Sequence, residues 1–267
     1  MSLTQANGLT VNYRWDGPDH GPVVMMAHSL GADLTMWDPQ VKALTGAGLR
    51  LLRYDLRGHG ASAVPAGPYT LEQLSADAVG LMDALGLPKV HFIGLSLGGM
   101  IGQMLGFKFP QRLLSLVLCS TSAHMPPREI WEERIQTVTS KGLGALVDAT
   151  MDRWFTKAGQ QRLASQVQKI RAIYLKTTPQ GFAGCCAAIR DMDLRPGIRT
   201  IDRPTLIMVG EHDQGTPVAA ARMIHEAILL SKLVVIAEAA HLQNIEQEDR
   251  FNRTLLEFFS EVAGEKE

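Results

Sequence analysis

The chain has 267 residues, 46% of them hydrophobic, which is enough to bury the core of a single domain. Its 26 Lys and Arg residues nearly balance its 27 Asp and Glu residues, so the composition excludes the basic surface of a nucleic-acid-binding protein and favours a small-molecule partner. The first residues do not form a basic-then-apolar leader, and no apolar run approaches the roughly 18 residues of a membrane span, so we expect a cytoplasmic protein with no membrane partner. The three cysteines lack Cys-x-x-Cys spacing, so we expect reduced thiols.

The first residues favour a β-hairpin, and buried strands are expected after it. Asn7-Gly8 suits a tight turn, and side chains of alternating character follow it in "LTVNYRWD". Residues 22–28 and 49–55 are short apolar runs, which are typical of parallel central strands covered on both faces. We therefore expect an antiparallel hairpin beside the first parallel strands.

Residues 71–85 are expected to form an amphipathic helix. Their apolar side chains recur every three or four positions, Thr70 and Gln73 form a capping box at the start, and Gly86 suits the end. The alternation continues with a strand over 89–94, a helix over 97–109 and a strand over 113–120. Alternating strands and helices predict an α/β protein with a doubly wound sheet.

The alternation stops at about residue 121, and residues 122–199 read as helices with several aromatic residues among charged ones. This segment predicts a helical cap inserted into a core made of residues 1–121 and 200–267. The strand and helix pattern then resumes with a strand over 203–210, a helix over 216–228, a strand over 232–237 and a helix over 248–262.

"GLSLG", residues 94–98, lies between a predicted strand and a predicted helix and matches the G-x-S-x-G pattern of a nucleophile elbow. A serine nucleophile must stand on a strained turn above the sheet, and flanking glycines remove the side chains that would collide there. Ser96 is therefore the candidate nucleophile. The pattern alone also suits a purely structural turn, whereas a dinucleotide-binding fingerprint would require a glycine where Leu97 stands.

A serine nucleophile needs a base and a carboxylate that orients the base, in the chain order serine, acid, histidine. His241 in "AEAAHLQNIE" follows the last predicted strand and is the candidate base; its alternative role is to cap the final helix. Asp213 in "IMVGEHDQGTP" follows the preceding strand, at the edge where open α/β sheets bind ligands, and is the candidate acid. Its competitors Asp191 and Asp193 lie in the insertion, where they are expected to hold the cap to the core.

Acyl transfer also needs two backbone donors for the oxyanion. The elbow predicts the N–H of Leu97, and the loop after the strand over 22–28 predicts the N–H of Leu30. The polar loop over 55–59 is expected to make structural hydrogen bonds. No His or Cys stands at ligand spacing from His212, so we expect no metal site and no cofactor.

Stretches spread along the whole chain resemble the 3-oxoadipate enol-lactonases, a group of α/β-hydrolases: "SLGADLTMWDPQ", "LRYDLRGHGAS", "GPYTLEQL", "GLSLGGMIGQ", "RWFT", "CCAAIRDMDLR", "RPTLIMVGEHD" and "AAHLQNIEQ". The first, third and sixth are the most specific, because generic hydrolase chemistry does not require them. The resemblance implies an α/β-hydrolase fold with a mostly parallel eight-stranded sheet and a helical cap. It also implies cleavage of a small unsaturated lactone that carries a carboxylate, in the bacterial breakdown of aromatic compounds.

A carboxylate on the substrate calls for a cation near the pocket. Trp131 and Arg134 are three residues apart, so on a helix they share a face and offer an aromatic wall beside a charge-assisted hydrogen bond. Trp154 and Arg190 are further candidates of the same kind. The alternative is that Trp131 packs within the cap and Arg134 is solvated.

One position departs from the pattern. Many α/β-hydrolases have His-Gly before the oxyanion donor and enol-lactonases often have Asn-Ser, whereas this chain has His28-Ser29. The fold and the triad fix acyl transfer but not the acyl group, so an esterase or lactonase of different substrate range is the first alternative. Cleavage of an amide or carbon–carbon bond is another. A ligand-binding protein without turnover is a third, against which Ser96, Asp213 and His241 together argue.

Overall fold

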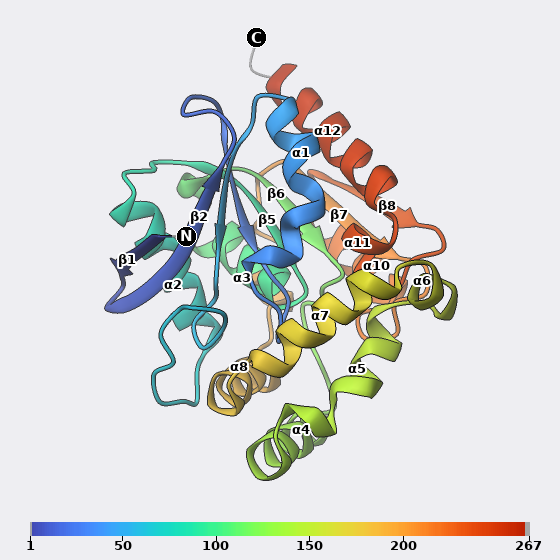
Figure 1. Ribbon diagram of the computed structural model, residues 1–267. Helices are drawn as coiled ribbons and strands as arrows, with labels where there is room; N and C mark the ends of the chain where they lie inside the picture. Colours follow the sequence, from blue (N-terminus) through green and yellow to red (C-terminus); the bar gives the residue numbers. More distant parts are fainter. Residues whose placement is uncertain (1, 265–267) are drawn as a thin grey trace.

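The computed structural model describes residues 2–264 and has an eight-stranded sheet at its centre (Figure 1). The strands follow the spatial order β1-β2-β4-β3-β5-β6-β7-β8. β2 runs antiparallel to both of its neighbours, β1 and β4, and the pairs that join β4, β3, β5, β6, β7 and β8 are parallel. The strands are β1 Ser2–Ala6, β2 Leu9–Asp16, β3 Val23–Ala27, β4 Arg50–Tyr54, β5 Val90–Leu95, β6 Leu113–Cys119, β7 Thr205–Gly210 and β8 Ser231–Ile236.

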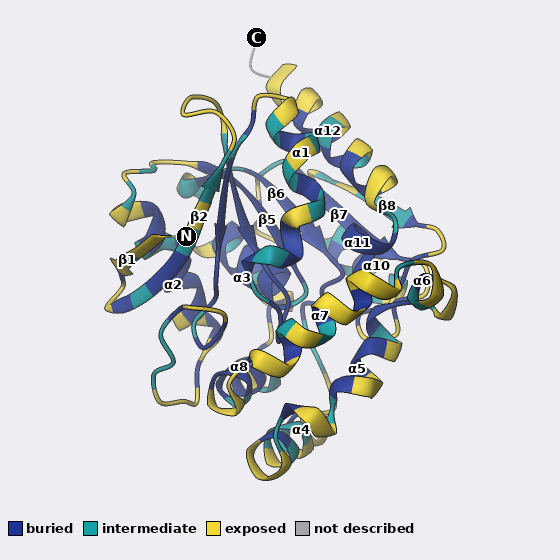
Figure 2. Ribbon diagram, viewed as in Figure 1, coloured by how far each residue is buried: buried dark blue, intermediate teal, exposed yellow. Residues whose placement is uncertain are grey.

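The predicted hairpin and strands are confirmed. Asn7 and Gly8 both have positive φ, 52° and 70°, as a two-residue turn between β1 and β2 requires. All six residues of β5 are buried, which explains why its sequence is apolar on both faces except at His91, whose Nδ1 lies 2.7 Å from the hydroxyl of Ser115. Figure 2 shows the central strands almost entirely buried, whereas the helices around them expose their outer faces.

Helices cover both faces of the sheet. On one face α1 (Asp38–Gly46) packs against α12 (Glu248–Gly264), next to the short α11 (Gln243–Glu246). On the other face α2 (Leu71–Ala84) packs against α3 (Leu97–Lys108), and α9 (Arg195–Ile198) lies between α3 and α10 (Val218–Ala227). The capping box of Thr70 and Gln73 is present at the start of α2, as predicted.

Helix α1 was not predicted from the sequence. This helix buries only Gln40 and Leu44, so it has no apolar stripe that a periodicity could reveal. Gln40 is buried because its side-chain amide donates to the carbonyl of Asn244, 2.8 Å away. A hydrogen bond between distant parts of the chain therefore replaces the usual apolar contact.

The remaining α-helices of the described chain, α4 to α8, lie within residues 122–199. Figure 1 shows α4, α5, α7 and α8 gathered beyond one end of the sheet. Their bounds are α4 Arg128–Lys141, α5 Val147–Trp154, α6 Lys157–Arg162, α7 Ala164–Lys176 and α8 Pro179–Asp191. Within residues 2–264, no helix is both long and apolar enough to cross a membrane.

Candidate active site

Ser96 stands on a strained turn between β5 and α3. Its φ of 58° and ψ of −112° are unfavourable for a residue with a side chain. The glycines of the elbow are needed for space: a Cβ on Gly94 would lie 2.0 Å from the carbonyl oxygen of Gly98, and one on Gly98 would lie 2.2 Å from that of Ala27. The sequence pattern thus reflects the close approach of three backbone segments.

Hydrogen bonds from β6 and from the loop after it hold this turn in place. The N–H of Ser96 donates to the carbonyl of Cys119 at 2.8 Å, and the hydroxyl of Thr121 donates to the carbonyl of Ser96 at 2.8 Å. These bonds engage the backbone of Ser96 and leave its side-chain hydroxyl available. The strained residue is therefore fixed by its surroundings.

Asp213 and His241 meet beyond the carboxyl ends of β7 and β8. The Nδ1 of His241 lies 2.8 Å from Oδ2 of Asp213, and both side chains are buried. The hydroxyl of Thr216 also donates to Oδ2 of Asp213 at 2.8 Å, and it lies 3.4 Å from Nδ1 of His241. Thr216 was not predicted, although its position three residues after the acid, ahead of a helix, is a signal for such a bond.

The environment of Asp213 favours its ionised form. Burial alone raises the pKa of a carboxyl group, but here the charge of His241 and the hydrogen bonds from His241 and Thr216 outweigh burial. The pKa of Asp213 therefore lies below its ordinary value. A carboxylate that accepts from Nδ1 leaves the Nε2 atom of the ring as a proton acceptor.

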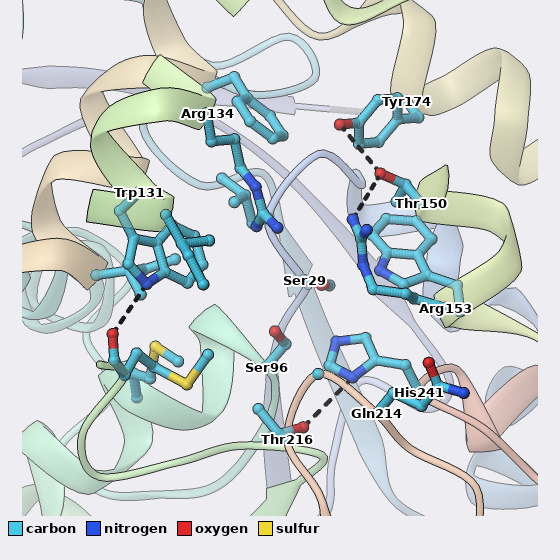
Figure 3. Close-up of a pocket in the computed structure, with 18 of the residues that line it drawn as sticks. Ser29, Ser96, Trp131, Arg134, Thr150, Arg153, Tyr174, Gln214, Thr216 and His241 are labelled. Atoms are coloured by element: carbon cyan, nitrogen blue, oxygen red, sulfur yellow. Dashed lines mark hydrogen bonds between the residues drawn. The ribbon is translucent and has the colours of Figure 1, made fainter. Parts of the chain in front are cut away.

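A cavity of about 380 Å³ lies above Ser96 (Figure 3). Figure 3 shows the Ser96 side chain close to the His241 ring. Within the described chain, no hydrogen bond joins the two side chains; such bonds often tighten only when substrate binds. From the core the cavity is lined by Ser29, Leu30, Ser96, Thr216 and His241, among others, and from the helices beyond the sheet by Trp131, Arg134, Thr150, Arg153, Trp154 and Tyr174.

Leu30 and Leu97, the two predicted oxyanion donors, flank Ser96. Leu30 lines the cavity, and Leu97 is the first residue of α3, where backbone N–H groups have no partner within the helix. The next N–H after Leu30, that of Gly31, donates to Nε2 of His59 at 2.9 Å. This bond occupies the Gly31 amide and fixes the orientation of the loop that carries Leu30.

His28 is a structural residue rather than part of the cavity wall. It is fully buried, its Nδ1 lies 2.7 Å from the carbonyl of Ser29, and its Nε2 accepts from the N–H of Leu56 at 3.0 Å. Burial lowers the pKa of His28 to about 4 and that of His59 to about 3. The two rings lie 5.3 Å apart and are neutral near pH 7, and they connect the loop after β3 to the loop after β4.

Two aromatic residues named from the sequence line the cavity. The Trp154 ring stacks on His241, with centroids 6.3 Å apart and planes at 23°. Trp131 is buried, donates from Nε1 to the carbonyl of Met125 at 3.0 Å, and carries the Arg134 guanidinium 4.6 Å above its ring. Trp131 therefore both packs within residues 122–199 and forms a wall of the cavity.

Arg190 does not reach the cavity. Its guanidinium forms a two-pronged pair with the neighbouring Asp191, at 2.9 and 2.7 Å, and Asp191 also contacts Arg128. Asp193, the other competitor for the acid, pairs with Arg195. Among the described residues, the side chain of Asp191 bonds only to arginines of the 122–199 segment, so it does not tie this segment to the core as expected.

Arg153, which stands beside Trp154 in "RWFT" and was not named from the sequence, lines the cavity instead of Arg190.

Glu246 connects the His241 loop to the helices beyond the sheet. This buried carboxylate accepts from the N–H of Ala240 at 2.8 Å and from both the N–H, at 2.9 Å, and the hydroxyl of Thr156. The N–H of Leu242 also donates to the carbonyl of Trp154 at 3.0 Å. The residues on either side of His241 are thus fastened to the end of α5.

Comparisons with known proteins agree with this architecture. The family model described as the alpha/beta hydrolase fold matches residues 22–248. The chain is 34% identical to 3-oxoadipate enol-lactonase 2 of Acinetobacter baylyi over 94% of this chain and 93% of that protein. It resembles the crystal structure of the enol-lactonase from Burkholderia xenovorans, with a TM-score of 0.94 and 39% identity over 97% of this chain and all of the other.

A malate-bound thermophilic esterase from Thermogutta terrifontis is also similar, with a TM-score of 0.92 and 28% identity over 98% of this chain and 99% of that one. The family match covers most of the chain, and the relatives align over nearly their full length. These relatives are two enol-lactonases and an esterase. The chain therefore belongs to the α/β-hydrolase family and is a hydrolytic enzyme of that family.

Proposed function

We propose that this enzyme opens a small enol-lactone that carries a carboxylate, of the 3-oxoadipate enol-lactone type. The observation that carries the proposal is the composition of the cavity. Ser96 and His241, which bonds to Asp213, line it together with arginine side chains, and apolar side chains form the walls between them. The names of the enol-lactonase relatives from Acinetobacter and Burkholderia support the choice of substrate.

The proposed reaction is acyl transfer through Ser96. Nε2 of His241 takes the hydroxyl proton as Oγ of Ser96 attacks the lactone carbonyl, and Asp213 holds the ring in the required tautomer. The N–H groups of Leu30 and Leu97 stabilise the oxyanion. The ring C–O bond then breaks, and the leaving enolate takes the proton from His241 and becomes a ketone.

A water molecule completes the cycle. His241 removes its proton, the hydroxide attacks the acyl ester, and Ser96 leaves with a proton returned by His241.

Every step uses side chains, backbone amides and water, so we propose no metal and no cofactor. The partner is a small lactone or ester, with no role for nucleic acid or membrane. The three cysteines are buried and free, which supports the proposal of a reducing, cytoplasmic location.

The substrate carboxylate is proposed to bind Arg134 beside Trp131, with Trp154 forming the wall next to His241. We also propose that residues 122–199 act as a cap on the core of residues 1–121 and 200–267, because the helices of this segment supply the cation and the aromatic walls. The neutral rings of His28 and His59 position the loop that carries Leu30.

The proposal is tested by steady-state hydrolysis of freshly generated 3-oxoadipate enol-lactone beside p-nitrophenyl acetate, with Ser96→Ala as control. A kcat/KM for the lactone that exceeds that for the ester by several orders of magnitude, with activity lost in Ser96→Ala, supports the proposal.

Cleavage of the ester without cleavage of the lactone would favour an esterase of different substrate range, the alternative that the similarity to the Thermogutta esterase supports. Failure of a fluorophosphonate probe to label Ser96 would favour a binding protein.

A further inference from the structure

Two guanidinium groups reach into the cavity from two different helices. Arg134 comes from α4 and Arg153 from α5, and both line the cavity. Figure 3 shows them on separate walls, above Ser96 and His241. The proposed function uses only Arg134, so the role of Arg153 needs a separate explanation.

In the part of the chain that the structure describes, neither guanidinium forms an ion pair with an Asp or Glu side chain, and Asp152, next to Arg153 in sequence, accepts from the side chain of Gln160 at 3.1 Å instead. Arg134 lies over the Trp131 ring, and Arg153 donates from Nη2 to the hydroxyl of Thr150 at 3.2 Å. None of the residues that line the cavity is Asp or Glu. By contrast, Arg53 and Arg57, which are also withdrawn from solvent, each pair with an aspartate.

A partly buried cation without a counter-charge is unfavourable, and two such cations in one cavity also repel each other. Burial lowers the pKa of Arg153 and the positive charge of Arg134 lowers it further, and these two effects outweigh the opposing charges of Tyr174 and Asp152. The two guanidinium groups therefore interact unfavourably. A single anion between them would remove both penalties. This is the arrangement that a carboxylate, with two oxygens, can satisfy.

Thr150 fixes the direction of Arg153. The Thr150 hydroxyl donates to the carbonyl of Leu146 at 2.8 Å and lies 3.4 Å from the Tyr174 hydroxyl, and its oxygen accepts from Nη2 of Arg153. One N–H group of Arg153 is therefore engaged by Thr150. The other donors of the guanidinium remain for a ligand in the cavity.

We propose that Arg153 and Arg134 together form one carboxylate-binding site, with one guanidinium from α4 and the other from α5 holding the same carboxylate. The proposal rests on the proposed function for the statement that this carboxylate is the side arm of the substrate. The site itself requires only a small organic acid. Arg153 thereby becomes a residue that determines preference for anionic over neutral substrates.

The test measures binding rather than turnover. Dissociation constants of butyrate and of butyramide, its neutral isostere, are determined by calorimetry for the natural enzyme and for Arg134→Gln and Arg153→Gln. The natural enzyme should bind butyrate more tightly than butyramide. Each single variant should weaken butyrate binding by roughly 10- to 100-fold, the range for loss of a charge-assisted bond, and change butyramide binding far less.

Arg128→Gln is the matched control, because Arg128 is on the same helix as Arg134, carries the same charge, and pairs with Asp191 outside the cavity. It should leave both dissociation constants unchanged. If either single variant keeps butyrate binding within about twofold of the natural enzyme, the arginines serve separate sites or none and the proposal is wrong. Equal weakening of butyrate and butyramide would also overturn it, since that outcome reports general damage to the cavity.

The outcome is independent of the substrate assay. An enzyme that does not open the enol-lactone but shows these butyrate effects would refute the proposed function and retain the two-arginine site. An enzyme that opens the lactone yet binds butyrate equally well in the natural and Arg153→Gln forms would retain the function and refute the site.

Discussion

Replacing Asp213 by Asn is expected to reverse the tautomer of His241. Oδ1 of Asp213 accepts from the N–H groups of Gly215 and Thr216, both at 2.9 Å, so the oxygen of an asparagine must take that position. Its NH2 group then occupies the place of Oδ2, 2.8 Å from Nδ1 of His241. An NH2 donor forces Nδ1 to accept, which puts the ring proton on Nε2, where it cannot receive the proton of Ser96.

The expected loss in kcat is about 10⁴-fold, the size found when a triad carboxylate is replaced by its amide, which corresponds to about 5 kcal/mol of transition-state stabilisation. Steady-state kinetics on the lactone or on p-nitrophenyl acetate measures it, with the thermal midpoint as a check of folding. Asp191→Asn is the matched control, because within residues 2–264 the side chain of Asp191 bonds to Arg190 and Arg128 outside the cavity, and it should leave kcat unchanged. A loss of less than about tenfold in Asp213→Asn would refute the assignment of the acid.

Three further predictions concern other parts of the molecule. His28 and His59 have pKa values of about 4 and about 3 in the folded state, below the unfolded value of about 6.5, so the unfolded state binds protons first as the pH falls. The free energy of unfolding, measured by denaturant titration at pH 7 and pH 5, should therefore decrease below pH 6.5 by up to about 1.4 kcal/mol per pH unit for each histidine. Gly98→Ala would place its Cβ 2.2 Å from the carbonyl oxygen of Ala27, so we expect loss of activity together with a lower thermal midpoint; an active, fully stable variant would contradict the backbone geometry of the elbow. Arg134→Ala should reduce kcat/KM for anionic substrates by roughly tenfold or more beyond its effect on neutral esters, and an equal loss on both would remove Arg134 from the carboxylate site.

The parts of the structure that follow local rules were predictable from the sequence. The Asn7-Gly8 turn, the capping box of α2 and the mainly apolar run of β5 each depend on neighbouring residues, and all are present. The elbow was recognisable because its glycines answer a steric requirement within a few residues. The order of elements then placed Asp213 and His241 at the same edge of the sheet.

Features that depend on contacts between distant residues were missed. Helix α1 is held by Gln40, whose partner Asn244 lies far along the chain, and its sequence shows no apolar stripe. Arg190 and Arg153 have the same side chain and both adjoin an aspartate in sequence, at positions 191 and 152. Only the packing of the helices shows that the first bonds to its neighbour while the second faces the cavity.

The side chain of Glu246 has a practical consequence for anyone who wishes to exchange the proposed cap for that of another hydrolase. Because this buried group accepts both from Thr156 and from the backbone next to His241, a foreign cap without a matching donor pair would remove the Thr156 donors from a buried polar group close to His241. A transplant designed around the outer helices alone would then alter the chemistry as well as the specificity. The useful unit of exchange is the cap together with the segment from Ala240 to Glu246.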